Sequence, residues 1–307
     1  MVVNGKGDSG ALAVGLRHET TGVGLRALAA KALHVAVCAP ARLIDVYDGA
    51  AHGWLSSHAF PPSTRNQKLN PPPAKFWQAF WQILEEAVAT RRRAPFTLAV
   101  MRLAGLLDPG LNDRVAAAAL QHPGVRDATT AGLLERIRIR ELSGFPPTSL
   151  GGAAHREAMV RGQVDQFLDL DTLSRADLPP PLDYLNARLL ESHPVWAALA
   201  GYGEGELDEI ALAAFRMGQF GHHHSSLLVG LTMATVAFDR PPGLETVLDS
   251  IFRGWMHGRE TPPLLDIAWS DLWHLPIDAV RQQLGVTLFP SPLTAAISQG
   301  VAAPGAN

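Results

Sequence analysis

Two side chains in the middle of the chain could together bind a divalent metal. His193 lies in the apolar segment 185–199, and Glu209 lies near the start of the apolar segment 210–217. A short loop of glycines and carboxylates separates the two segments. If both are helices joined as a hairpin, we expect the imidazole of His193 and the carboxylate of Glu209 to lie within reach of each other. Such groups on facing helices are ordinary ligands for zinc or another divalent metal.

This stretch resembles the signature of the Coq-four family of coenzyme Q (ubiquinone) biosynthesis. The family motif is His-Asp-x-x-His, then eleven residues, then Glu, and here His193 matches the first His and Glu209 the Glu at the full spacing. Five further positions in the same hairpin match the family pattern: Gly201, Tyr202, Ala214, Phe215 and Gln219. The resemblance extends over about residues 95–286 and includes a late Trp pair, Trp269 and Trp273.

Two positions of the motif depart from the family. Pro194 stands where the family has Asp, and Ala197 stands where it has the second His, so neither supplies a donor atom. The resemblance implies zinc or a similar ion that helps to remove or replace the ring carboxyl group of a polyprenylated quinone precursor. The departures put that chemistry in question, because two ligands rarely hold zinc. Proline also costs about 3 kcal/mol inside a helix, so we expect a kink or a new helix start at His193.

Other polar groups near the hairpin have simpler interpretations. His222, His223 and His224 follow the second segment and are interpreted as a polar turn between helices. They lie roughly 20 Å from Glu209 along a helix that rises about 1.5 Å per residue. The acidic run 204–208 is interpreted as a solvated loop that favours the helix dipole. The glycines in 201–205 follow a helix among acids, so they are not a dinucleotide fingerprint.

The composition limits the class of protein. Hydrophobic residues make up 47% and charged residues 18% of the 307 residues, and the formal net charge is -3. That balance predicts a globular chain without an overall attraction to nucleic acid. The single cysteine, Cys38, excludes an internal disulfide and a cysteine-based zinc framework. No run reaches the roughly 18 apolar residues of a spanning helix. We expect a cytoplasmic protein that can lie on the cytoplasmic face of a membrane.

Helical periodicity and breakers predict an all-α fold. Residues 1–94 form an N-terminal extension, which begins with a loose segment over 1–24 and contains a helix over 25–37, a Pro-rich linker over 60–73 and a helix over 74–90 with an aromatic stripe. Residues 95–290 form the Coq-four-like helical domain, and 291–307 form a flexible tail. No alternating strand and no internal repeat are found.

Three hypotheses of function follow. The first is a divergent Coq-four-like protein of isoprenoid-quinone metabolism that binds a polyprenyl lipid or quinone precursor between its apolar helices. The second is a non-catalytic scaffold that organises other biosynthetic proteins at a membrane. The third is a metal-dependent enzyme of another pathway, with a site rebuilt around His193 and Glu209. No catalytic constellation is found elsewhere, and the sequence leaves open whether the chain forms a homo-oligomer.

Overall fold

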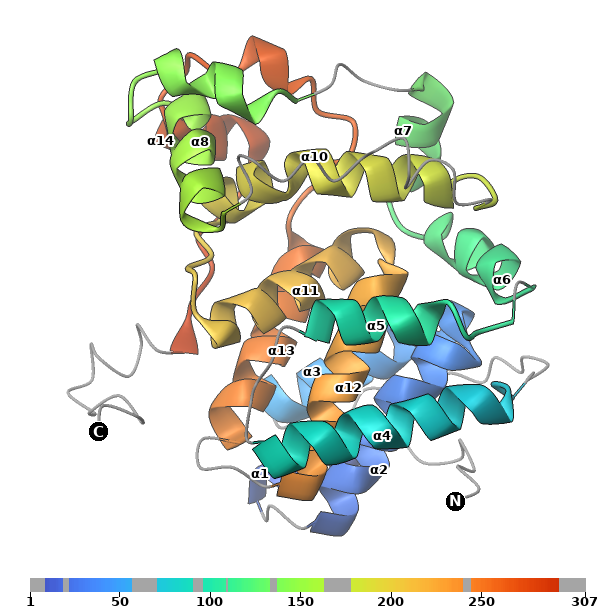
Figure 1. The fold of residues 1–307 in the computed structure, drawn as a ribbon. Helices are drawn as coiled ribbons and strands as arrows, with labels where there is room; N and C mark the ends of the chain where they lie inside the picture. The colour runs from blue at the N-terminus through green and yellow to red at the C-terminus, as the bar shows by residue number, and fades with distance from the viewer. Residues whose placement is uncertain are drawn as a thin grey trace.

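The computed structural model describes residues 9–18, 22–56, 71–90, 96–108, 110–132, 137–162, 178–239 and 244–292. Within these ranges the chain is all-α, as the sequence predicts, and forms no β-strand (Figure 1). None of the helices described is long and apolar enough to cross a membrane. The α-helices are α1 (Ser9–His18), α2 (Gly22–Val37), α3 (Leu43–Ser56), α4 (Ala74–Thr90), α5 (Phe96–Ala104), α6 (Gly110–Ala119), α7 (Val125–Ala131), α8 (Leu150–Val160), α10 (Leu182–Ala200), α11 (Glu206–Phe220), α12 (His223–Asp239), α13 (Leu244–Glu260) and α14 (Ile277–Leu284). Three 3-10 turns, Pro40–Arg42, Ile139–Gly144 and Trp269–Asp271, lie between them.

Helix α11 lies between two hydrophobic cores. One face contributes Ile210 and Met217 to a core shared with α1–α5, α12 and α13. The other face contributes Leu212 and Phe220 to a core shared with α6–α8, α10 and α14. Figure 1 shows α11 between α10 on one side and α12 and α13 on the other. A helix that is apolar on two faces is stable only when both are covered, so α11 is the central element of the fold.

Glycines let α13 pack directly on the backbone of α11, its most extensive neighbour. A Cβ atom added at Gly254 would overlap with the carbonyl oxygen of Ala211. One added at Gly258 would overlap with the carbonyl oxygen of Phe215. The two helices are therefore held at a separation that no larger side chain at these positions would permit.

Helix α10 corrects one expectation from the sequence. It runs without a break from Leu182 to Ala200, with Pro194 buried in its interior, so no new helix starts at His193. Proline leaves one carbonyl of the preceding turn without its helical partner. Burial of much of the helix, including Trp196 and Leu199, offsets that loss. The helix ends at Gly201, whose φ of 74° is left-handed, and the chain turns from there into α11.

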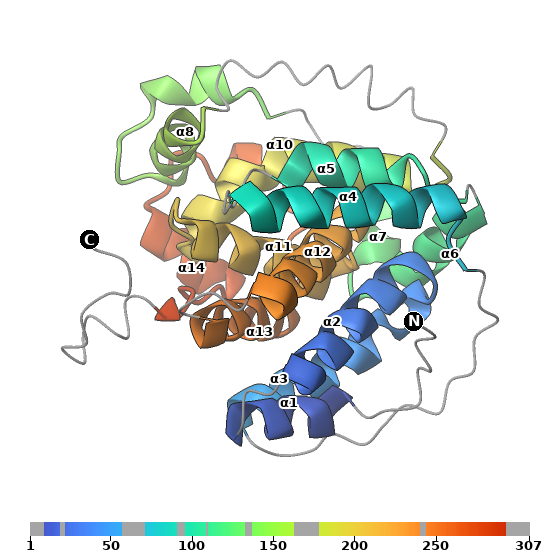
Figure 2. The same ribbon diagram turned by 60° about the horizontal axis from the view of Figure 1, so that its bottom comes forward.

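The N-terminal region corrects another expectation. The segment over residues 1–24 was expected to be loosely ordered, but Ser9–His18 forms α1 and packs against α3. Glycine permits the close approach of the two helices, because a Cβ atom at Gly53 of α3 would overlap with the carbonyl oxygen of Gly10 of α1. In Figure 2, α1, α2 and α3 lie together at one side of the molecule.

The predicted domain boundaries remain predictions. Helices on both sides of the boundary at residue 94 share the first core, since Phe76, Phe80 and Val100 all belong to it. The Pro-rich linker over 60–73 and the tail over 291–307 fall mostly outside the described residues. The helices predicted over 25–37 and 74–90 correspond to α2 and α4.

We predict that Gly258→Ala destabilises the fold. The new methyl group would overlap with the backbone of α11, and such overpacking costs about 1–3 kcal/mol. Chemical denaturation measures the loss. Gly15→Ala is the matched control, because a Cβ atom there meets nothing within 4 Å, and the change should add up to about 1 kcal/mol through helix propensity. Equal effects of the two substitutions would contradict the close packing of α11 on α13.

Candidate functional site

Glu209, one of the two predicted metal ligands, forms an ion pair with Arg161. Arg161 follows the last turn of α8, and its Nε also donates to Oε1 of Glu157 at 2.6 Å. Its Nη2 donates to the carbonyl oxygen of Gly203, at 2.7 Å, in the loop before α11. The guanidinium thus ties α8 to the α10–α11 hairpin and engages the carboxylate that a metal would need.

His193, the other predicted ligand, lies on α10 and is half-buried. Its Nδ1 atom is buried without a hydrogen-bond partner. Burial holds the pKa of the imidazole well below its usual value, and the positive charges of Arg216 and Arg161 act in the same direction.

Arg216 brings a second cation into the hairpin. Its Nε and Nη2 atoms are buried, and neither has a hydrogen-bond partner. Burial, followed by the charge of Arg161, lowers the pKa of Arg216 to about 9, so the guanidinium still carries its charge at neutral pH. No hydrogen bond or ion pair joins His193 to Glu209 in the described part of the chain.

The three consecutive histidines are half-buried and lie where α11 ends and α12 begins, the place at which the sequence predicts a polar turn. His222 precedes α12, and the backbone N–H of Ser225 donates to its Nδ1 at 3.3 Å, which caps the helix. Burial holds the pKa of His222 well below its usual value, and neighbouring His224 and Arg216 add to the effect. The end of the triple-His segment thus lies near the same cationic group as His193.

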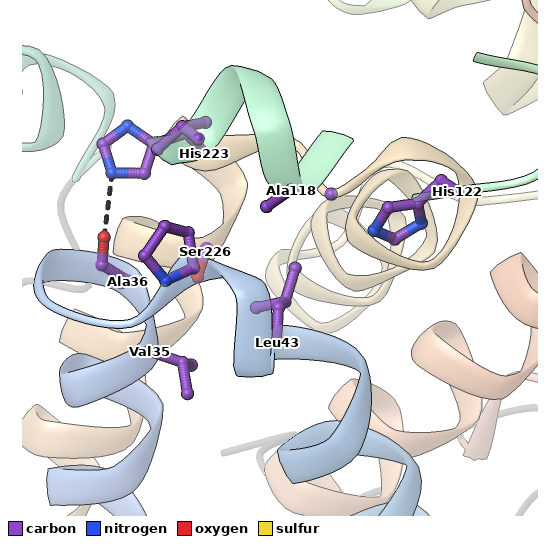
Figure 3. A pocket seen from close by; sticks show the side chains of 10 residues that line it. Val35, Ala36, Leu43, Ala118, His122, His223 and Ser226 are labelled. Atoms are coloured by element: carbon purple, nitrogen blue, oxygen red, sulfur yellow. Dashed lines mark hydrogen bonds between the residues drawn. The ribbon is translucent and has the colours of Figure 1, made fainter. Parts of the chain in front are cut away.

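A small pocket lies beside these histidines (Figure 3). His223 donates from Nε2 to the carbonyl oxygen of Ala36 at 3.0 Å, and His122 donates from Nδ1 to that of Gly218 at 3.3 Å. The Oγ of Ser226 is buried without a partner. With a volume of about 10 Å³, the pocket is near the lower limit for a single water molecule. It is a gap in the packing, not a substrate site.

Two further polar residues of the hairpin hold the fold together. Tyr202 donates its hydroxyl hydrogen to Nδ1 of His257 at 2.8 Å, and Nε2 of His257 donates to the carbonyl oxygen of Thr287 at 3.0 Å. Gln219 donates to the carbonyl oxygens of Gly258 and Thr261, both at 2.8 Å, from the end of α11. Two positions that match the family pattern thus have structural roles, which their spacing in the sequence could not reveal.

An apolar groove lies between α2, α4 and α12. It has a volume of about 270 Å³, close to the lower end of the roughly 300–1,000 Å³ of small-molecule sites. Aromatic side chains of α4 and α12 form its walls, and α2 closes it. The side chains that define it are Arg26, Ala30, Trp77, Phe80, Trp81 and Phe238. The sequence predicts the aromatic stripe of α4 but not its position across from α12.

Comparison with known proteins supports the fold. No family model matches the chain, and no curated protein sequence matches it. Among solved structures, the chain is similar to a candidate ubiquinone biosynthesis protein from Nostoc punctiforme PCC 73102, with a TM-score of 0.51. The two are 20% identical, and the match covers 69% of this chain and 96% of that chain. At this identity the likeness establishes a shared helical fold.

The residues of the hairpin do not suit the divalent metal that the Coq-four resemblance implies. Glu209 is engaged by Arg161, and the charge of Arg216 acts on His193. Pro194 and Ala197 supply no donor. In the parts of the chain that the structure describes, no three His, Cys, Asp or Glu side chains gather where they could hold an ion. A metal bound by His193 and Glu209 remains a prediction, and no catalytic step is derived from it.

We predict that the protein becomes less stable as the pH falls from about 6.5 to 4. Burial lowers the pKa of His122 and of His223 to about 4 from an ordinary 6.5. In that window the unfolded chain binds more protons than the folded one, so each such histidine removes about 1.4 kcal/mol of unfolding free energy per pH unit. Denaturation at a series of pH values measures the slope. His122→Asn should lower the slope of unfolding free energy against pH by the contribution of one histidine. The stability of each protein at pH 8 serves as the reference.

We also predict well under one zinc per chain in protein purified without chelators. Pro194→Asp together with Ala197→His should raise zinc affinity, because the pair restores two donors. Elemental analysis measures the zinc content, and calorimetric titration measures the zinc affinity of the variant. Stoichiometric zinc that disappears in His193→Ala would contradict this prediction and would reinstate the metal site.

Proposed function

We propose that this protein acts in isoprenoid-quinone metabolism as a divergent Coq-four-like protein and that it binds a polyprenyl lipid or quinone precursor in the groove between α2, α4 and α12. The groove is the observation that carries the proposal. The fold shared with a candidate ubiquinone biosynthesis protein supports the metabolic assignment. The metal-dependent ring decarboxylation associated with the family is not part of the proposal, because the cations in the hairpin do not suit it.

The groove suits a long apolar ligand. Trp77, Phe80 and Trp81 line it from α4, and the rings of Trp81 and Phe238 meet edge to face with centroids 5.8 Å apart. Small side chains on the opposite wall, among them Ala30 and Ala234, leave the volume open. A flexible isoprenoid chain could follow such a channel. Each methylene that it buries contributes about 0.8 kcal/mol, so a few isoprene units suffice without contacts to a head group.

The rim of the groove combines apolar and basic groups. Trp81 and Phe238 are 41% and 49% exposed, which is high for aromatic side chains in a packed protein. The guanidinium of Arg26 lies 5.7 Å from the ring centroid of Phe238. Tryptophan and arginine together are typical of surfaces that meet lipid head groups. We place the protein at the periphery of the cytoplasmic membrane face, where a polyprenyl chain could enter the groove.

We predict that native mass spectrometry of gently purified protein shows a bound polyprenyl or fatty species, and that added prenyl quinone raises the melting temperature. Ala30→Phe should reduce both effects because its ring occupies the groove. Ala131→Phe makes the same change on the exposed end of α7 and should preserve both.

If prenyl compounds of every length leave the melting temperature unchanged and no lipid co-purifies, lipid binding is wrong. The scaffold hypothesis would then take its place, with the exposed aromatic rim as a surface for other biosynthetic proteins. An equal loss of response in Ala30→Phe and Ala131→Phe would show that the stabilisation does not come from the groove.

A further inference from the structure

Arg26 is the single charged residue among those that line the apolar groove. It is exposed, and its guanidinium lies 5.7 Å from the ring centroid of Phe238. Within the described ranges of the chain, no carboxylate pairs with it. The lining contains no acidic residue that would balance this charge. A cation at an apolar cavity without a nearby acid favours a negative charge on the molecule that enters.

The two ends of the groove differ. Helices α2 and α12 run antiparallel, because Arg26 meets Phe238 at one end and Leu33 meets Gly230 at the other, where Cδ2 of Leu33 would lie 3.1 Å from an added Cβ atom. Beside Arg26, Phe238 is 49% exposed and Trp81 is 41% exposed. Leu33 is only 8% exposed. The lining is therefore open to water beside Arg26 and buried beside Leu33.

This difference sets the direction of a bound chain. Arg26, Ala29, Ala30 and Leu33 all line the groove from α2, and their spacing places them on one face of that helix. From residue 26 to residue 33 the helix rises about 10 Å at 1.5 Å per residue. A polar head group in the buried end would lose its hydrogen bonds to water. The tail of an amphiphile therefore lies toward Leu33, and its head lies at the open end, beside Arg26.

We infer that Arg26 is a specificity-determining residue of the groove, which selects amphiphiles with an anionic head and holds that head at the open end. A guanidinium binds an oxyanion through two parallel N–H donors and can stack on an aromatic ring at the same time. The inference rests on the proposed function, because it concerns the same groove. It adds the charge and the direction of the ligand and assigns Arg26 no chemical step.

Geranic acid, geraniol and geranylamine test the inference on the full-length protein at neutral pH. They have the same kind of isoprenoid tail, with an anionic, a neutral and a cationic head respectively. We expect calorimetry to rank their affinities in that order, with steps of roughly two- to fivefold, as for ion pairs near water. Added sodium chloride should reduce the differences without abolishing binding, because salt screens exposed charges but not apolar contacts.

Variants of Arg26 separate its charge from the shape of the groove. Arg26→Gln should remove the preference for geranic acid and leave the affinity for geraniol unchanged. Arg26→Glu should reverse the preference, so that geranylamine binds more tightly than geranic acid. Arg126→Gln is the matched control, since it removes the same charge from an exposed position on α7, outside the lining of the groove, and should keep the original order.

The outcomes distinguish this inference from the proposed function. Equal affinities for the three compounds in the unaltered protein would overturn the inference and leave lipid binding in place. A preference for geranic acid that persists in Arg26→Gln, or that disappears equally in Arg126→Gln, would also overturn it. Absence of binding by all three compounds would contradict lipid binding in the groove, and the inference would fall with it.

Discussion

The double burial of α11 is the constraint on which the rest of the structure depends. One face of this helix completes the core of α1–α5, α12 and α13, and the other completes the core of α6–α8, α10 and α14. The two cores therefore meet at this one helix. Apart from Arg216 and Gln219, the polar side chains of α11 lie in its first turn, where Glu209 is still 43% exposed and pairs with Arg161.

Local signals in the sequence predict much of the fold. The apolar segments on either side of residues 201–205 become α10 and α11, and glycine ends α10 as its position suggests. Local signals fail where a contact between distant segments decides the outcome. Pro194 stays inside a helix because both of its flanks are packed, and Gly10 lies in a helix because α3 approaches it closely. Neither contact can be read from neighbouring residues.

The candidate site shows the same division between local and distant information. Spacing in the sequence singles out His193 and Glu209, but their roles depend on Arg161, which lies more than thirty residues before His193. In the sequence, Arg216 occupies an ordinary polar position of an amphipathic helix. Only the structure shows that both faces of that helix are covered. Its charge acts on His193, one of the two residues at which the Coq-four resemblance implies a metal.

The glycine contacts between α11 and α13 limit how this protein can adapt to a ligand. Gly254 and Gly258 seat α13 against two carbonyl groups one turn apart on α11, so sliding either helix would drive side chains into backbone. The pair behaves as a rigid frame, so adjustment around a ligand in the apolar groove would fall on α2, α4 and α12, which line it.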